Sequence, residues 1–442
     1  MKTKKSIKII ALALAVGACA AFALAGCSSA SADDEGTAGA PDLVSSATRN
    51  VGNNGESSAA ADGSPLVNGE ELFSQRDLEQ TADLSEAVYL TLSDGEDILI
   101  REEGVYVLQG SASEVTVTVE AEDTAKVQLV LDGVSIVNSN FPCIYVKSAD
   151  KVFLTTAADS SLSVTGSFVS DGETGTDAVI FSREDLSLNG TGTLRISSVK
   201  NGVSCKDDLK ITGGSYIISA GSKCLEANDS IRIAGGSFTL TAGSDALHAE
   251  NDDDDSLGYV YIGGGSFSIS AQDDGIHGKA FVQIDGGSFT ISAAEGIEAT
   301  YVQLNGGTLD IQSWDDGINA ARKSGAYPVY VEVNGGEVSI SMSAGDTDGI
   351  DSNGSIAVNG GTISITGNSS FDYDGSAVFN GGTILVNGQE LSSIPNQMMG
   401  GPGGFGGGQP GGQGGFGGGQ PGGQGGFGGG QPGGQGGPGR RG

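Results

Sequence analysis

The hydrophobic and polar positions of this chain follow a short phrase that returns at nearly regular intervals. In Ile284-Asp-Gly-Gly-Ser-Phe-Thr-Ile-Ser-Ala293, apolar and polar residues alternate around a glycine pair. Such pairs begin at residues 213, 235, 264, 286, 306, 335, 360 and 381, so successive pairs are 20 to 29 residues apart. A period of this size is typical of solenoid proteins.

Each repeat predicts three short strands. Alternation with a period of two indicates strands such as Val282–Ile284 and Ser288–Ser292, and the glycine pair between them marks a sharp corner. A third phrase, such as Asp316-Gly-Ile-Asn-Ala320, closes the unit. Helical repeats would need a 3.6-residue period, and a leucine-rich repeat would need a leucine and asparagine spacing that is missing. We therefore expect an all-β fold, a parallel β-helix with one coil per repeat.

One repeated column is apolar. In a β-helix, equivalent residues of successive coils stack at the interstrand distance of ~4.8 Å. The column consists of Tyr216, Phe238, Phe267, Phe289, Leu309, Val338, Ile363 and Ile384. Because its members alternate with Ser and Thr, we expect a buried ladder rather than a strip that stacks on sugars. Each buried aromatic ring should contribute roughly 1.5–3 kcal/mol.

A second repeated column is acidic and carries the candidate chemistry. It consists of Asp245, Asp274, Glu295, Asp316, Asp348 and Asp374. Further acids and one amide flank it, namely Asp273, Asp315 and Asp372 just before it and Glu298, Asn319 and Asp351 three residues on. Unit charges ~4.8 Å apart repel by about 3.5 kcal/mol at an effective dielectric constant of 20, so the column favours cations between its rungs. A set of oxygen ligands indicates Ca²⁺ rather than Zn²⁺.

Alternatives to the metal site stay open. The column is otherwise a solvated acidic edge whose Asp-Gly pairs only form turns. The insertion Asn251-Asp-Asp-Asp-Asp255 at this corner either completes the site through Asn251 and Asp252 or forms a charged loop. The two histidines, His248 and His277, occupy the position three residues after the column. We expect them to be tolerated surface residues rather than zinc ligands.

The two ends of the chain differ from the repeats. Residues 1–26 combine a lysine-rich start with an apolar run and predict a lipoprotein signal peptide, with Cys27 as the lipidated residue. An ordinary cleaved signal is the alternative. Residues 27–85 predict a flexible linker, whose block 68–84 could cap the first coil. Residues 86–395 form the predicted β-helix, and the Gly/Gln/Pro-rich residues 396–442 predict a disordered tail that spans the wall or is adhesive.

The net charge and the cysteine content limit the partners and the covalent links that this protein can have. Removing residues 1–26 leaves 22 − 4 = 18 basic residues against 55 acids, a net charge of −37, which argues against nucleic acid as a partner. Cys143, Cys205 and Cys224 remain after Cys27 and are expected to be small buried thiols. No second apolar run is long enough to cross a bilayer. We expect a monomer that contacts the membrane only through its lipid anchor.

Several phrases together resemble a known bacterial family of carbohydrate-binding β-helices. They are Leu129-Val-Leu-Asp-Gly-Val-Ser-Ile136, Ile144-Tyr-Val-Lys-Ser-Ala-Asp-Lys-Val-Phe-Leu154, Asp177-Ala-Val-Ile-Phe-Ser182, Lys206-Asp-Asp-Leu-Lys-Ile-Thr-Gly-Gly214 and His248-Ala-Glu-Asn-Asp252. The resemblance covers roughly residues 85–395. It implies a secreted, right-handed parallel β-helix that binds Ca²⁺ at the Asp-Gly-Ile and Asn-Asp positions and has affinity for cellulose and polygalacturonate. Glu295 and Glu298 depart from the aspartates of that family.

The resemblance and the acidic column lead to one functional hypothesis and two rivals. We expect a non-catalytic protein in which Ca²⁺ bridges the acidic corner to an acidic polysaccharide, with Trp314 and Tyr373 stacking on sugar rings. A pectate-lyase-like enzyme would need a basic residue near the metal, for which Lys279, Arg322 and Lys323 are the candidates. The remaining rival is a structural adhesin in which Ca²⁺ stabilises the fold.

Overall fold

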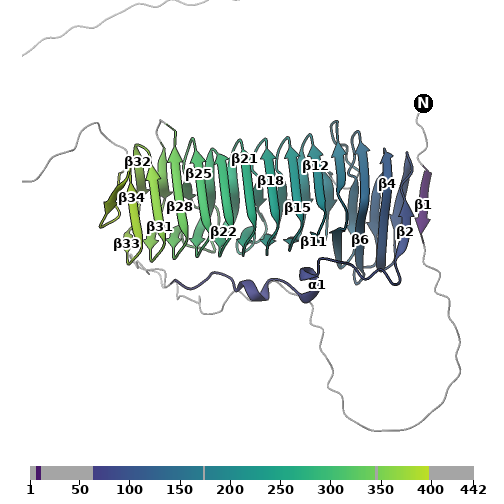
Figure 1. Ribbon diagram of the computed structural model, residues 1–442, viewed down its shortest axis with the longest axis horizontal. Helices are drawn as coiled ribbons and strands as arrows, with labels where there is room; N and C mark the ends of the chain where they lie inside the picture. Colours follow the sequence, from purple (N-terminus) through teal and green to yellow (C-terminus); the bar gives the residue numbers. More distant parts are fainter. Residues whose placement is uncertain (1–5, 11–62, 173–174, 344–346, 398–442) are drawn as a thin grey trace, which may run out of the picture. The chain divides into compact units, whose positions relative to one another are not determined.

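The chain forms a parallel β-helix, as the repeats predict. The computed structural model describes residues 6–10, 63–172, 175–343 and 347–397. Strands of successive coils pair in parallel and stack along one axis (Figure 1). They make three ladders, which we call the aromatic, acidic and strap-facing ladders. The strands run from Val88 to Leu391, apart from one short strand near the N-terminus.

The aromatic ladder follows the glycine corners. Its strands are the second halves of β4 (Gly104–Ser113) and β6 (Lys126–Asn138), then β9 (Ser160–Val164), β12 (Thr193–Ser198), β15 (Ser215–Ala220), β18 (Ser237–Ala242), β21 (Ser266–Ala271), β23 (Ser288–Ala293), β25 (Thr308–Ser313), β28 (Glu337–Met342), β31 (Thr362–Thr366) and β34 (Thr383–Val386). The last of them pairs antiparallel with β35 (Gln389–Leu391), which ends the ladder.

The acidic ladder comes next in each coil. Its strands are β1 (Ser6–Ile10), β3 (Glu96–Ile100), β5 (Val117–Glu120), β7 (Ile144–Ser148), β10 (Ala178–Ser182), β13 (Asn201–Cys205), β16 (Leu225–Ala227), β19 (Leu247–Ala249), the first halves of β22 (Asp274–Ile284) and β24 (Glu295–Leu304), β26 (Ile318–Ala320), β29 (Asp348–Ser352) and β32 (Ser369–Tyr373). Strand β1 lies inside the segment that the sequence predicts to be a signal peptide.

The strap-facing ladder closes each coil. Its strands are β2 (Val88–Thr91), the first halves of β4 and β6, β8 (Lys151–Thr156), β11 (Asp185–Gly190), β14 (Asp208–Ile211), β17 (Ser230–Ile233), β20 (Tyr259–Ile262), the second halves of β22 and β24, β27 (Tyr330–Val333), β30 (Ser355–Val358) and β33 (Ala377–Phe379).

The apolar column forms a buried ladder inside the coils, as predicted. The rings of Phe238 and Phe267 stack with centroids 4.6 Å apart, and those of Phe267 and Phe289 are also 4.6 Å apart. Tyr216 begins the stack, and all its members are at most 3% exposed. Parallel pairing keeps this register from coil to coil. The repeated alternation therefore becomes one continuous hydrophobic core.

The glycine pairs make corners that few other residues would allow. Gly287 has φ = +111°, a conformation that L-residues with side chains rarely adopt. A Cβ atom there would lie 3.0 Å from a ring carbon of Phe289 and 3.1 Å from the carbonyl oxygen of Gly265. The close approach of corner and core explains why this position repeats as glycine.

Residues 63–80 form a strap that runs along the outside of the strap-facing ladder (Figure 1). The strap contains a 3₁₀ turn, η2 (Gly69–Glu71), and a short helix, α1 (Gln75–Leu78). Its Val67 and Leu72 are 2% exposed and pack in a cluster with aromatic residues of the coils, including Tyr261 and Phe281. The strap buries an outer face that alternation alone would assign to solvent.

Buried polar side chains fix the position of the strap. Gln283 accepts a hydrogen bond from the Val67 amide at 2.9 Å and donates one to its carbonyl at 3.1 Å. Gln303 likewise accepts from the Leu66 amide. At the other end, Asp77 is 1% exposed and its Oδ1 lies 2.6 Å from Lys151 Nζ. The prediction of a flexible linker up to residue 85 is therefore wrong from residue 63 onward, and this block covers a lateral face rather than the first coil.

The structure tests the predictions about the cysteines, but it does not describe most of the two chain ends. Cys143, Cys205 and Cys224 are free and buried, as predicted. Among the described residues, no helix is long and apolar enough to cross a membrane. Most of the predicted signal peptide, the Cys27 lipidation site and tail residues 398–442 lie outside the described residues.

Candidate functional site

The acidic ladder brings five predicted site residues into one vertical line, which we call the corner column. It contains Asp245, Asp274, Glu295, Asp316 and Asp348. The Ala246 amide donates to the Asp274 carbonyl at 3.0 Å, and Asp274 pairs with Glu295. The amides of Gly296 and Gly317 then donate to the carbonyls of Asp316 and Asp348. The prediction that these acids share one corner is confirmed.

A second line of side chains lies three residues further on, on the outer face of the same strands. This face column contains Glu226, His248, His277, Glu298, Asn319, Asp351 and Asp372, which pair in this order. Each member sits between two inward-facing residues; His277, for example, follows Ile276, which is 0% exposed. The face column is thus a row of polar groups one strand spacing apart.

Two residues of the last coil, one predicted in the corner column and one predicted just before it, belong elsewhere. Asp348 pairs with Ser369, so the column ends on a serine rather than on Asp374. Asp372, expected just before the corner, pairs with Asp351 and belongs to the face column. Asp374 follows β32, and its amide donates to the Ser352 carbonyl. The Asp-Gly pair at residues 374–375 therefore lies after its acidic-ladder strand, whereas the earlier pairs lie at or just before the start of theirs.

The acidic insertion also lies at another corner. Asn251 and Asp252 follow β19, beyond the end of the strand opposite to Asp245. Asn251 Nδ2 donates to Asp229 Oδ1 at 2.6 Å, and the Lys279 ammonium lies 3.4 Å from Asp255. Of the two alternatives for the insertion, completion of the corner site is the wrong one, because β19 separates the two corners.

The histidines are buried, which corrects their assignment as surface residues. His248 and His277 are 8% and 7% exposed, and their rings stack with centroids 4.5 Å apart and an interplanar angle of 15°. His277 Nδ1 lies 2.8 Å from Asp274 Oδ2 and 2.9 Å from Glu298 Oε2. Burial alone would lower the pKa of His277, but hydrogen bonds to these two carboxylates outweigh it and raise the pKa to about 9.

Basic side chains contact several carboxylates in this N-terminal half of the site. Lys323 Nζ lies 2.7 Å from Glu298 Oε1. Burial favours the neutral form of Glu298, but His277 and Lys323 lower its pKa to about 2. Carboxylate oxygens of Asp245, Asp273 and Asp274 lie within 4.8 Å of one another, with His248 Nδ1 2.7 Å from Asp245. Glu298 is therefore compensated by charged partners, whereas burial and neighbouring carboxylates still raise the pKa of Asp274 to about 7 and that of Glu295 to about 8.

The C-terminal half of the site lacks such compensation. Within the described residues, no ion pair reaches Asp316, Asp351 or Asp372. Burial, followed by repulsion from neighbouring aspartates, raises the pKa of Asp316 to about 7 and that of Asp351 to about 6. Asn319 Nδ2 donates to Glu295 at 3.1 Å, while its Oδ1 is buried without a partner. The C-terminal half of the site therefore combines aspartate carboxylates with one amide oxygen, Asn319 Oδ1, that has no hydrogen-bond partner.

The two candidate aromatic residues differ in exposure. Trp314 is 43% exposed and directly precedes Asp315, which is also exposed, and Asp316. Tyr373 is half-buried and packs against the hydrophobic core, at a position that pairs with Ser352. Of the two, only Trp314 has the exposed ring that stacking on a sugar requires.

Two further acidic features near the site were not predicted from the sequence. Glu226, the first member of the face column, forms ion pairs with Lys206 and Lys223. Burial favours its neutral form, but these lysines lower its pKa to about 2. Carboxylates of Asp185, Asp207 and Asp208 also gather within 4.8 Å, at the corner before the strap-facing ladder. The available signal was the acidic pair that recurs before these strands, in Glu184-Asp185 and Asp207-Asp208.

A protein family and a relative match parts of this chain in sequence. The carbohydrate-binding domain-containing protein family matches residues 94–370 and 297–391. A protein of that description from Acetivibrio thermocellus is 34% identical over 129 residues, which cover 28% of this chain and 45% of the relative. This chain therefore aligns with less than half of the relative's length.

A solved structure also resembles the chain. It is described as the polysaccharide lyase-like protein from C. thermocellum in a gadolinium derivative, and it is 21% identical with a TM-score of 0.39. The match covers 66% of this chain and 98% of that one. Because the family match spans most of the chain, this protein belongs to the carbohydrate-binding domain-containing protein family.

Proposed function

We propose that this protein binds an acidic or cellulosic polysaccharide through Ca²⁺ held on its acidic ladder, without catalysing a reaction, and that a lipid on Cys27 anchors it to the bacterial surface. Its family membership supports carbohydrate binding. The observation that carries the Ca²⁺ hypothesis is the group of oxygen ligands in the C-terminal coils, where burial and neighbouring aspartates raise the pKa values of Asp316 and Asp351.

The residues of these coils fit a calcium ion. Asp316, Asp348, Asp351 and Asp372 supply carboxylates, and Asn319 supplies the buried amide oxygen that has no hydrogen-bond partner. Calcium takes six to eight oxygen ligands and tolerates irregular geometry. Repulsion between stacked carboxylates costs about 1 kcal/mol per pair in water and more when they are partly buried, so a divalent ion here would stabilise the fold.

The ion would also supply the charge needed to attract an acidic glycan. A chain with a net charge of −33 repels a polyanion. When bound, Ca²⁺ can accept carboxylate ligands from both the protein and the sugar. The ring of Trp314 lies beside this group in the sequence and is exposed, so it is suited to stack on a sugar face.

The basic residues near the acids favour binding over lyase chemistry. A lyase needs a base that is neutral near the working pH. Burial alone would lower the pKa of Lys323, but its hydrogen bond to Glu298 outweighs burial and raises that pKa. Lys279 contacts the acidic insertion instead of the corner column. The contact with Glu298 thus favours the charged form of the Lys323 amine.

Calcium titration of variants tests the proposed site. Asp316→Asn combined with Asp351→Asn should remove most of the Ca²⁺ heat in calorimetry and most of the Ca²⁺-induced rise in melting temperature. Asp310→Asn is the matched control, because Asp310 is an exposed acid on β25 in the same coil as Asp316. Unchanged Ca²⁺ binding in the double variant would overturn the assignment.

A further inference from the structure

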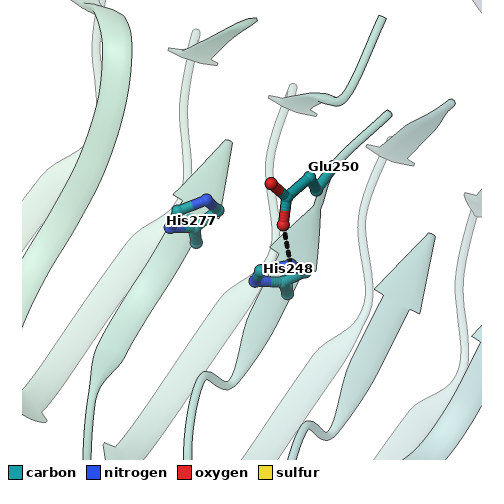
Figure 2. Close-up of side chains that lie close together, drawn as sticks. All are labelled: His248, Glu250 and His277. Atoms are coloured by element: carbon teal, nitrogen blue, oxygen red, sulfur yellow. Dashed lines mark hydrogen bonds and ion pairs between the residues drawn. The ribbon is translucent and has the colours of Figure 1, made fainter. Parts of the chain in front are cut away.

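The two imidazoles of the chain meet on neighbouring coils. His248 in β19 pairs in register with His277 in β22, so the face column carries two adjacent imidazoles where other coils have Glu, Asn or Asp. Figure 2 shows the two rings side by side with Glu250 above His248. The rings are nearly parallel and almost fully buried.

The Nδ1 atom of each ring faces an aspartate three residues earlier. His248 Nδ1 lies 2.7 Å from Asp245 Oδ2, and His277 Nδ1 lies 2.8 Å from Asp274 Oδ2. The first contact is close but falls outside the angular limits of a hydrogen bond, whereas the second is a hydrogen bond. Carboxylates in this position orient imidazoles and make them more basic ligands. Both Nε2 atoms therefore face away from the corner column.

Glu250 completes a set of three ligands on that side. His248 Nε2 lies 3.2 Å from Glu250 Oε2, and one ligand atom from each of His248, His277 and Glu250 lies within 4.8 Å of the others. The Glu250 side chain is 46% exposed, which leaves an open side for an ion to enter. Small rotations of these side chains would bring three donors to one ion.

We propose that His248, His277 and Glu250 bind a divalent transition-metal ion, separately from Ca²⁺. Two imidazole nitrogens and one carboxylate suit Zn²⁺ and its neighbours in the first row, whereas Ca²⁺ prefers a set of oxygens alone. Asp245 and Asp274 act as positioning residues. The proposal does not rest on the proposed polysaccharide binding, because its ligands are outside the oxygen set of the C-terminal coils.

Zinc titration of the full chain, with excess Ca²⁺ present, tests the proposal. The sequence contains two histidines, so selective ¹⁵N-histidine labelling reports on these two rings alone. We expect one Zn²⁺ per chain at this site and simultaneous shifts of both Nε2 resonances. Histidine resonances that stay unchanged through the titration would overturn the proposal.

Variants separate the site from other zinc ligands. Loss of outer-shell partners costs about 10–100-fold in metal affinity, so loss of a direct ligand in His248→Gln or His277→Gln should cost at least that much. Glu250→Gln alters a half-exposed side chain, keeps the fold intact and should also weaken binding. Glu337→Gln is its control, because Glu337 is exposed on β28 in the aromatic ladder. Equal zinc affinity of Glu250→Gln and Glu337→Gln would contradict the proposal.

Discussion

The Asp77 carboxylate lies 2.6 Å from the Lys151 ammonium, and this contact joins the strap to the coils. Asp77 also accepts a hydrogen bond from the Ser187 hydroxyl at 2.8 Å. Since both charged side chains are shielded from water, removing one partner leaves the other charge buried and unpaired. The ion pair between Asp77 and Lys151 therefore anchors the strap to the folded domain, and substituting either residue tests this anchoring directly.

Replacing Asp77 with alanine should release the α1 end of the strap. We expect a loss of about 3–5 kcal/mol, as for other buried ion pairs that lose one partner. Trypsin should then cut after Arg76, whose guanidinium lies 4.3 Å from the centre of the Phe153 ring in the intact protein. Asp83→Ala is the control, because Asp83 is a nearby exposed acid that accepts a local hydrogen bond from the Ser85 amide. Equal cleavage of the two variants would show that the ion pair does not hold the strap.

Docking of the strap should weaken in acid. Burial would raise the pKa of Asp77, but Lys151 outweighs it and lowers the pKa from 3.8 to about 2. Because the folded value is depressed, this carboxylate stabilises the folded form above pH 3.8, and that stability is lost as pH falls toward 2. Pepsin cleavage within residues 63–80 should therefore rise between pH 4 and pH 2 while the coils resist. In Asp77→Asn, cleavage of the strap should depend much less on pH. Equal cleavage of the native strap from pH 4 to pH 2 would refute the prediction.

The stacked rings should dominate the stability of the central coils. Phe267 stacks on Phe238 and Phe289, so Phe267→Ala removes two ring contacts and leaves a cavity. Such changes typically cost about 3–5 kcal/mol. Thr239→Ala lies on the outer side of β18 and should change the free energy of unfolding by less than about 0.5 kcal/mol. Denaturant unfolding of the two variants checks the difference, and similar midpoints would contradict a buried ladder.

Close backbone packing explains the glycines of the acidic ladder. A Cβ atom on Gly296 would lie 2.4 Å from the Gly317 carbonyl oxygen and 2.5 Å from Ile311 Cγ2. Gly296→Ala should therefore destabilise the protein by about 1–3 kcal/mol. A Cβ atom on Gly235 would meet no heavy atom within 4 Å, so Gly235→Ala should be neutral or slightly stabilising. Thermal unfolding distinguishes them, and a neutral Gly296→Ala would show that the coils can separate at this point.

Much of the fold was predictable because one physical rule repeats. Stacking converts a period in sequence into a column in space, and so Phe238 over Phe267 and Asp274 over Glu295 follow from counting residues. The rule failed in the last coil, where the spacing changes. The Asp-Gly pair at residues 374–375 led to the prediction that Asp374 continues the corner column. In the structure, Ser369 pairs with Asp348 at that position.

Features that depend on distant segments were not predictable from the period. Val67 meets Gln283, and Asp77 meets Lys151, through contacts that leave no repeated pattern in the strap. The burial of the two histidines likewise depends on the side chains around them and not on their position in the repeat. The period places His277 on the outer face, but the flanking carboxylates and the stacked ring of His248 bury it.

Binding of the full chain to immobilised polygalacturonate, measured in Ca²⁺ and again after chelation, tests the central claim most directly. If Ca²⁺ on the C-terminal coils links the acidic ladder to the glycan, the protein should be retained with Ca²⁺ and lost with chelator, and Asp316→Asn with Asp351→Asn should remove retention while Asp310→Asn keeps it. Equal retention with and without chelator would contradict the account.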